Sequence, residues 1–154
     1  MWKNTTEYGK YPISLHDCRA TGLTVQGDEL VFTFADGFWV YDEDNEGGMI
    51  KTETAEVRIV GAADGEVHLF RELRLFRRRI CTTRITVPLE TLAANLNSGR
   101  WELEFLYEYH GGVGVIYQGW LWMKRRPYHR ECNLSMGYKK IEYRWNDLQE
   151  GRSW

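Results

Sequence analysis

Short runs of β-branched and aromatic residues, separated by turns that contain glycine and aspartate, recur along most of the chain. In the clearest run, Leu30, Phe32 and Phe34 alternate with residues that belong to the opposite face. A period of two is typical of a strand with one buried face. Because short turns join successive runs, we expect antiparallel strands. The sequence therefore predicts a mainly β fold, an antiparallel β-sandwich or a partly open barrel of seven to nine strands.

Three places predict which runs pair with each other. One is the turn at residues 110–112, across which the runs 101–109 and 113–123 are predicted to pair. Asp36-Gly37 can supply the positive φ angles of a tight turn, so the runs on either side of it are predicted to form a hairpin. The last two runs, 132–136 and 138–145, are predicted to form another pair. Between these places, the acidic, glycine-bearing segment 42–52 is expected to be an exposed loop.

One segment predicts a helix. Residues 88–97 begin at a proline, carry apolar side chains three and four positions apart, and are followed by Gly99, which suits a helix end. Segment 69–80 is ambiguous, since its apolar residues fit both helical and strand spacing. We predict a strand there because β-rich sequence lies on both sides.

Length and charge exclude several classes of protein. A chain of 154 residues is expected to form a single globular domain over 1–154. Residues 1–10 are a candidate for a loose N-terminal arm. The net charge of −2 gives no general attraction to nucleic acid or to an anionic membrane. No apolar run is long enough to span a bilayer, and the N-terminus lacks the apolar segment of a secretory signal. Three widely spaced cysteines favour a reducing environment, so we expect a cytoplasmic location.

An acid, a base and a thiol are adjacent at His16, Asp17 and Cys18. If residues 11–19 form a strand, His16 shares one face with Cys18, and Asp17 shares the other with Arg19. Asp17 then does not orient His16 as in a catalytic triad. We expect Asp17 to pair with Arg19 or with an arginine of a neighbouring strand, and we expect no catalysis by this segment alone.

A second histidine and cysteine, His129 and Cys132, occur near the end of the chain. Together with His16 and Cys18 they supply four groups that zinc binds tetrahedrally, provided that the two segments meet. The spacing matches no common zinc motif, and free cysteines are usually small buried apolar groups. We therefore expect no cofactor. A metal-binding protein or an enzyme that uses these four residues is the alternative.

Five arginines lie within residues 71–79, and Arg71, Arg74 and Arg78 are candidates for binding a partner or an anionic ligand. Basic groups interleaved with aromatic ones also suit a nucleic-acid backbone. Acidic residues at 42–46 offer counter-charges, however, so we prefer salt-paired, solvent-exposed strands, and nucleic acid is the less favoured partner.

Aromatic residues make up 14% of the chain, and Trp120 and Trp122 share one face of a late run. Such rings either pack in the core or form a stacking platform for a sugar or a partner chain. Since we find no complete catalytic constellation, enzymatic activity stays open but is not favoured. Tyrosine, tryptophan and arginine often anchor interfaces. We expect a non-catalytic domain that binds another protein, for example as an inhibitor or immunity protein, or else a small ligand. An anion or nucleic-acid binder that uses Arg71–Arg79 is the second alternative.

Overall fold

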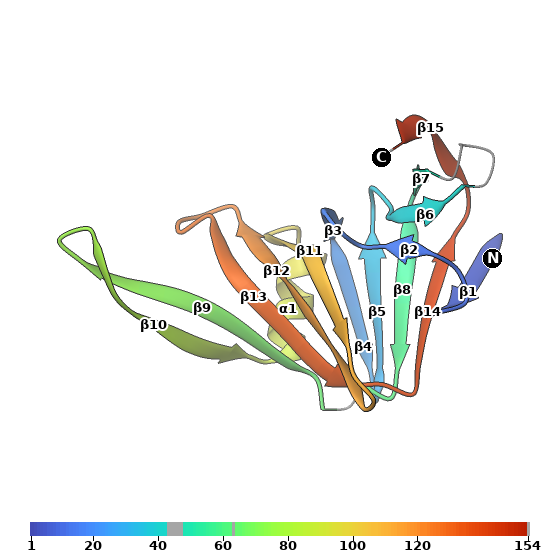
Figure 1. The fold of residues 1–154 in the computed structure, drawn as a ribbon. Helices are drawn as coiled ribbons and strands as arrows, with labels where there is room; N and C mark the ends of the chain where they lie inside the picture. Colours follow the sequence, from blue (N-terminus) through green and yellow to red (C-terminus); the bar gives the residue numbers. More distant parts are fainter. Residues whose placement is uncertain (43–47, 63, 154) are drawn as a thin grey trace.

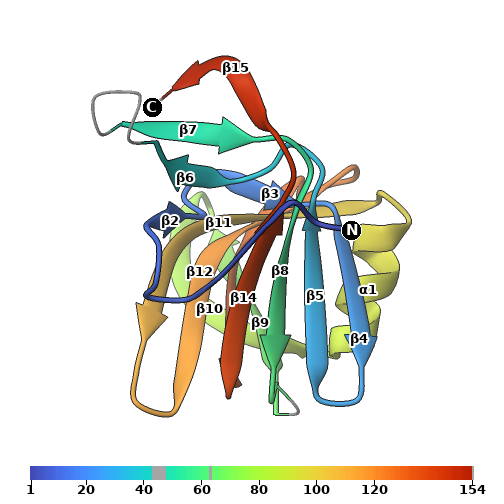
Figure 2. The same cartoon turned by 90° about the vertical axis from the view of Figure 1, so that its right-hand side faces the viewer.

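The computed structural model describes residues 1–42, 48–62 and 64–153. It is mainly β, with 64% strand and 6% helix, and its three antiparallel sheets pack together as in a β-sandwich (Figures 1 and 2). This confirms the predicted fold class. The described residues form fifteen strands rather than seven to nine. Several of the additional strands have only two to four residues, which is too short to produce a periodic pattern in the sequence.

The first sheet has five strands, and one of its faces forms much of the core. Its order is β1 (Asn4–Glu7), β14 (Lys140–Trp145), β8 (Ala55–Val60), β5 (Glu29–Phe34) and β4 (Gly22–Gln26). Leu30, Phe32 and Phe34 of β5 are buried, as their alternation predicts. Within residues 1–10, β1 pairs along its whole length with β14.

The second sheet has six strands and carries the candidate site. Its order is β10 (Arg78–Val87), β9 (Glu66–Leu75), β13 (His129–Gly137), β12 (Gly114–Met123), β11 (Trp101–His110) and β3 (Cys18–Ala20). Its inner face packs against the first sheet; Phe105 of β11, for example, contacts the rings of Phe32 and Phe34 with centroids 5.6 and 5.4 Å apart.

A third sheet lies across one end of the sandwich (Figure 2). Its order is β15 (Leu148–Ser153), β7 (Met49–Thr52), β6 (Trp39–Tyr41) and β2 (Ile13–Ser14). The prediction of an exposed loop at 42–52 is wrong for 49–52, because β7 pairs on both sides and buries Lys51 and Thr52. Residues 43–47 of that prediction lie outside the described residues.

The pairing predicted across residues 110–112 is confirmed, since β11 pairs with β12. The other two predicted strand pairings are wrong, for one reason. A turn does form at Asp36-Gly37: the Gly37 N–H donates to the Phe34 carbonyl at 3.1 Å, and Gly37 has φ +65°. Yet β5 pairs with β4 and β8, whereas β6 pairs with β2 and β7. Likewise, β13 and β14 belong to different sheets. These turns move the chain from one sheet to another, and a local pattern does not distinguish such a turn from a hairpin.

The single helix of the described residues, α1 (Leu89–Asn97), confirms the helix prediction. It buries Leu92 and Leu96, and it contacts β4, β11 and β9. Gly99, just beyond its end, has φ +65°, the left-handed conformation that favours glycine. None of the described helical segments is long and apolar enough to cross a membrane.

Candidate functional site

Strands β9 and β10 form a hairpin whose outer half extends beyond the sandwich (Figure 1). We call residues 71–86 the hairpin arm. Its turn consists of Phe76 and Arg77, which have φ +46° and +68°, as in a two-residue hairpin loop. The strand prediction for 69–80 is thus confirmed. Every residue of the arm is exposed.

One face of the arm, which we call the apolar face, carries most of its apolar side chains. Residues paired across the two strands share a face, so Leu73, Leu75, Cys81 and Ile85 lie together on the side that continues from the core residue Leu69. The same face also carries Arg71, Thr83 and Arg78. Leu73, Leu75 and Ile85 are 37%, 56% and 38% exposed. This apolar face therefore carries core-type side chains past the point where the core ends.

The opposite, basic face carries Glu72, Arg74, Thr82 and Arg84, together with Arg79 next to the turn. Residues 71–86 contain six arginines and one glutamate, a net charge of +5. Glu72 pairs with Arg74 at 2.6 Å and with Arg79 at 3.7 Å, and these arginines hold the pKa of the Glu72 carboxyl below its usual value.

The other four arginines, at positions 71, 77, 78 and 84, form no ion pair with any described residue. Salt pairing within the described structure thus involves only two of the six arginines on the arm. Of the acidic segment 42–46, which the sequence offers as a source of counter-charges, residues 43–46 lie outside the described residues.

A groove of about 840 Å³ lies where the arm diverges from β13. Its lining brings together the sequence candidates Arg71, Arg74, Trp120 and His129, and adds Arg130. A volume of this size accommodates a small ligand or several side chains of a partner. Of the remaining candidates, Arg78 belongs to the apolar face beside Leu75, outside the groove lining.

The two tryptophans lie on the outer face of the six-stranded sheet, where His129 contacts both rings at centroid distances of 5.3 Å. The Trp122 Nε1–H donates to Glu104 at 2.8 Å, and the Arg19 guanidinium lies over the Trp122 ring at 4.7 Å. Trp122 is thereby fixed by its neighbours, whereas Trp120 borders the groove.

The four metal candidates do not lie together. Cys18 and Cys132 occupy one row of the sheet, in the register Cys18–Phe105–Gly119–Cys132, so three strand spacings or roughly 14 Å separate them. His129 lies three residues from Cys132 and on the opposite face. The described residues hold no group of three or more histidine, cysteine or acidic side chains arranged for a metal ion.

The predicted geometry of the first candidate segment is wrong. Asp17 has φ +58° and interrupts the expected strand, and the Cys18 N–H donates to the Leu15 carbonyl across the turn. The Asp17 carboxylate lies 3.6 Å from His16 Nε2. Arg19 instead pairs with Glu102 and Glu104, each at 3.2 Å.

Neither buried thiol is poised to react. Burial raises the pKa of both Cys18 and Cys132 to about 12, so each remains a protonated thiol at neutral pH. The nucleophile and metal ligand is the thiolate. Both side chains act in this structure as small apolar groups of the core.

A second constellation, which the sequence analysis missed, lies inside the sandwich. Glu108, His110 and Tyr117 face inward from β11 and β12, with Glu108 directly opposite Tyr117. Glu108 Oε1, His110 Nε2 and the Tyr117 hydroxyl are buried and have no hydrogen-bond partner among the described residues. Tyr8 stacks on the His110 ring at 3.7 Å. We call these three inward residues the interior polar cluster.

Burial sets the protonation of this cluster. It raises the pKa of Glu108 to about 7, lowers that of His110, and raises that of Tyr117 well above its ordinary value. Near pH 7, Glu108 is therefore divided between its acid and carboxylate forms, while His110 is largely neutral. Such groups can exchange a proton, but Glu108 Oε2 and His110 Nε2 are 3.8 Å apart, beyond hydrogen-bond distance.

A β-bulge explains why the alternation in the sequence does not predict that Glu108 faces inward. The β11–β12 register shifts between Phe105 and Tyr107, so that even-numbered residues face outward before the bulge and inward after it. Gly119 permits the bulge, because a Cβ there would lie 1.7 Å from the Glu104 carbonyl oxygen. The one sequence feature that indicates a bulge is Gly119, a glycine within an otherwise regular strand pattern.

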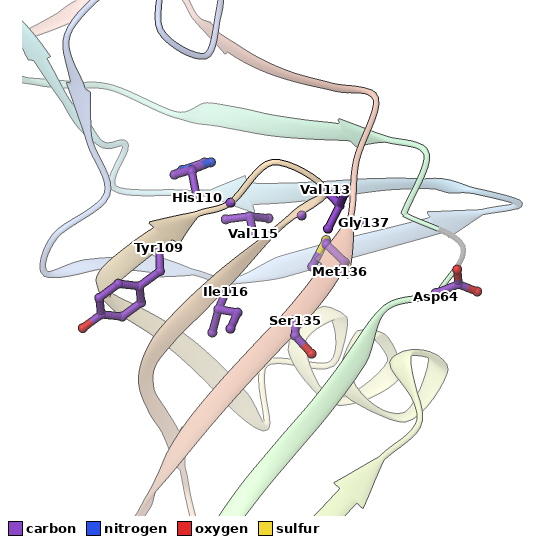
Figure 3. A pocket seen from close by; sticks show the side chains of 11 residues that line it. Asp64, Tyr109, His110, Val113, Val115, Ile116, Ser135, Met136 and Gly137 are labelled. Atoms are coloured by element: carbon purple, nitrogen blue, oxygen red, sulfur yellow. The ribbon is translucent and has the colours of Figure 1, made fainter.

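A shallow surface hollow of about 560 Å³ borders this region. Figure 3 shows Tyr109 and Ile116 on one side of the β11–β12 ribbon and His110 on the other. The wall of the hollow is mainly apolar, with Val113, Ile116 and Met136. The unpartnered His110 Nε2 is buried and is not displayed to solvent there.

No family model matches the chain, and neither a curated protein nor a solved structure matches it significantly. The geometry of the arm, the groove and the interior polar cluster is therefore the basis for a functional assignment.

Proposed function

We propose that the chain is a non-catalytic protein-interaction domain and that the hairpin arm is its contact element. The observation that carries this proposal is the exposed apolar face of the arm. Leu73, Leu75 and Ile85 extend the core surface into solvent, and Phe76 at the turn is 91% exposed.

Covering this face is favourable, since burial of apolar surface contributes roughly 25 cal/mol per Å². An isolated two-stranded hairpin is also only marginally stable in water. No second layer of described residues packs against the arm, so a partner that packs there supplies that layer. Exposed aromatic and arginine side chains are the usual anchors of such contacts.

The chemistry of the arm favours a protein over a nucleic acid. Its arginines suit acidic groups of either class, but Leu73, Leu75 and Ile85 find a complementary surface only on a protein. An inhibitor or immunity-type role, in which a small domain binds one partner tightly, is consistent with this arrangement. We also propose a cytoplasmic location, which the three free cysteines support.

Site-specific photo-crosslinking tests the proposal. A benzophenone amino acid replaces Phe76 in one variant and Tyr107, exposed on the outer sheet face, in another, and both are expressed in cells that naturally contain the chain. We expect one protein adduct from position 76 and none from position 107. The identified protein is then purified, and Leu75→Ser should weaken its binding by about tenfold or more, whereas Tyr107→Ser should not. Equal adducts from both positions, or equal affinities of both variants, would overturn the proposal.

A further inference from the structure

We infer that β10 is an acceptor for an extended strand of the partner, and that this strand alternates apolar with acidic side chains. The inference rests on the proposed function and specifies the chemistry of the partner. It depends on three separate features: an unpaired strand edge, an uninterrupted register, and a contrast along β10 between the face of Cys81 and Ile85 and the face of Arg84.

Strand β10 is the terminal strand of its sheet, and among the described strands it pairs with β9 alone. One row of its backbone N–H and C=O groups therefore faces away from the sheet. A row of this kind is a template for the addition of another strand, which forms main-chain hydrogen bonds with it.

The register leaves room for a strand of useful length. The β9–β10 pairing is irregular only between Arg79 and Cys81, close to the turn. From Cys81 to Val87 the pairing is continuous over seven residues. Recognition by strand addition uses segments of about this length, because strands in proteins average roughly five to six residues.

The side chains that flank this edge specify the partner. On the apolar face, an added strand would lie beside Cys81, Thr83 and Ile85; on the basic face it would lie beside Thr82 and Arg84. Neighbouring strands place side chains of the same face within about 4.5–5.5 Å of each other. Since Arg84 has no ion-pair partner among the described residues, an acidic side chain opposite it gains a new ion pair.

Protection of the edge is the simplest other explanation of the arginines, because charged side chains discourage strands from adding to an edge. It accounts for the basic face, but it does not account for the exposed Leu73, Leu75 and Ile85 on the opposite face. A second copy of the arm is disfavoured as the occupant, because two arms of net charge +5 repel each other.

The first test uses a synthetic peptide of nine residues that alternates valine and glutamate, with blocked ends. The control peptide has the same composition, with valines and glutamates in separate blocks. By calorimetry and amide hydrogen exchange, we expect the alternating peptide to bind at least about tenfold more tightly and to slow exchange within residues 81–87. Equal affinities, or binding without protection of β10, would overturn strand addition.

Backbone methylation tests the hydrogen bonds directly without any change to the folded chain. In an extended peptide, the N–H groups of the valines and of the glutamates point to opposite edges. We expect methylation of one set to abolish binding and methylation of the other set to preserve it, since only one edge faces β10. If both methylated peptides bind as tightly as the parent, the inference is wrong. The crosslink from position 76 is unaffected by that result, so the two proposals fail separately.

Charge reversal tests the basic face. Arg79→Glu combined with Arg84→Glu should abolish binding of the valine–glutamate peptide and create binding of a valine–lysine peptide. Arg100→Glu, at an exposed position outside the arm, is the matched control and should change neither affinity by more than about twofold. If the reversed variant shows no binding of the valine–lysine peptide while its circular dichroism spectrum is native, the assigned face is wrong.

Discussion

Glu108 is an acidic residue whose surroundings oppose its charge. Its side chain is 21% exposed, its Oε1 is fully buried, and no described residue donates a hydrogen bond to that atom. His110 and Tyr117 are nearby, but neither supplies a charge that compensates a carboxylate. Burial consequently favours the neutral acid, which is why the pKa of Glu108 rises to about 7.

We predict that Glu108→Gln stabilises the protein at pH 8 and leaves its stability nearly unchanged at pH 4.5. Between the ordinary pKa of 4.5 and the folded value of about 7, the folded state keeps a proton that the unfolded chain has released. The free energy of unfolding therefore falls as pH rises through this window, by on the order of 2–3 kcal/mol. Glutamine does not ionise, so the variant avoids that loss.

Urea denaturation of both proteins at pH 4.5 and pH 8 measures this difference. His110, whose pKa is lowered, acts in the opposite direction, since stability is lost as pH falls below 6.5. Because His110 lies 3.8 Å from Glu108, its contribution is common to the two proteins only at pH 8, where the imidazole is largely neutral in both the folded and the unfolded states. Glu150→Gln, at an exposed position, is the control. An equal effect of the two substitutions would show that burial of Glu108 is not the cause.

Gly119 provides a second prediction at this scale. We expect Gly119→Ala to lower the free energy of unfolding by about 3 kcal/mol, because its Cβ would overlap the Glu104 carbonyl oxygen at 1.7 Å. Gly112→Ala is the control, since no atom lies within 4 Å of the added carbon. The denaturant midpoints of the two variants, compared with that of the original protein, test this prediction. Similar midpoints would mean that the bulge tolerates a side chain.

Among the elements, the hairpin arm combines a strained turn with an exposed aromatic residue. Phe76 and Arg77 both adopt the left-handed conformation, which costs a residue with a Cβ roughly 1 kcal/mol or more. Asn-Gly is the preferred pair for such a turn. Phenylalanine at this position is therefore better explained by contact with a partner than by stability of the hairpin.

We predict that Phe76→Asn combined with Arg77→Gly stabilises the arm and weakens binding to the partner. The stabilisation should be about 1 kcal/mol, seen as slower amide exchange in residues 71–86. The loss of affinity should be about tenfold, because the aromatic anchor is removed. Faster exchange in the arm would contradict the assignment of strain to the turn, and unchanged affinity would contradict the role of Phe76.

For the whole molecule, the arm and the sandwich are separable in their contributions to stability. The core residues lie in the three sheets, α1 and adjoining segments, and none of them lies in residues 71–86. We predict that replacing residues 72–82 by Asn-Gly, which joins the paired positions 71 and 83, leaves the melting temperature within about 4 °C of its original value. Calorimetry of the shortened chain measures this. A much larger decrease would mean that the arm supports the fold rather than a partner.

The sequence alone determined the features that depend on local periodicity. Alternation identified the buried face of β5, helical spacing and a terminal glycine identified α1, and β-rich flanks identified the strands of the arm. Each of these follows from the backbone geometry of a few consecutive residues, which side-chain pattern reports directly.

Apart from the β11–β12 hairpin, the tertiary structure alone decided which strands pair, and hence where the candidate sites lie. The turns after β5 and β13 resemble hairpins locally but lead into other sheets, since pairing depends on contacts between residues distant in sequence. The bulge between Phe105 and Tyr107 reverses the alternation and buries Glu108. Similarly, Arg71, Arg74 and Trp120 meet at one groove only because β9 diverges there from β13. A local sequence pattern does not predict where two strands diverge, because the divergence is stabilised by packing between residues distant in sequence.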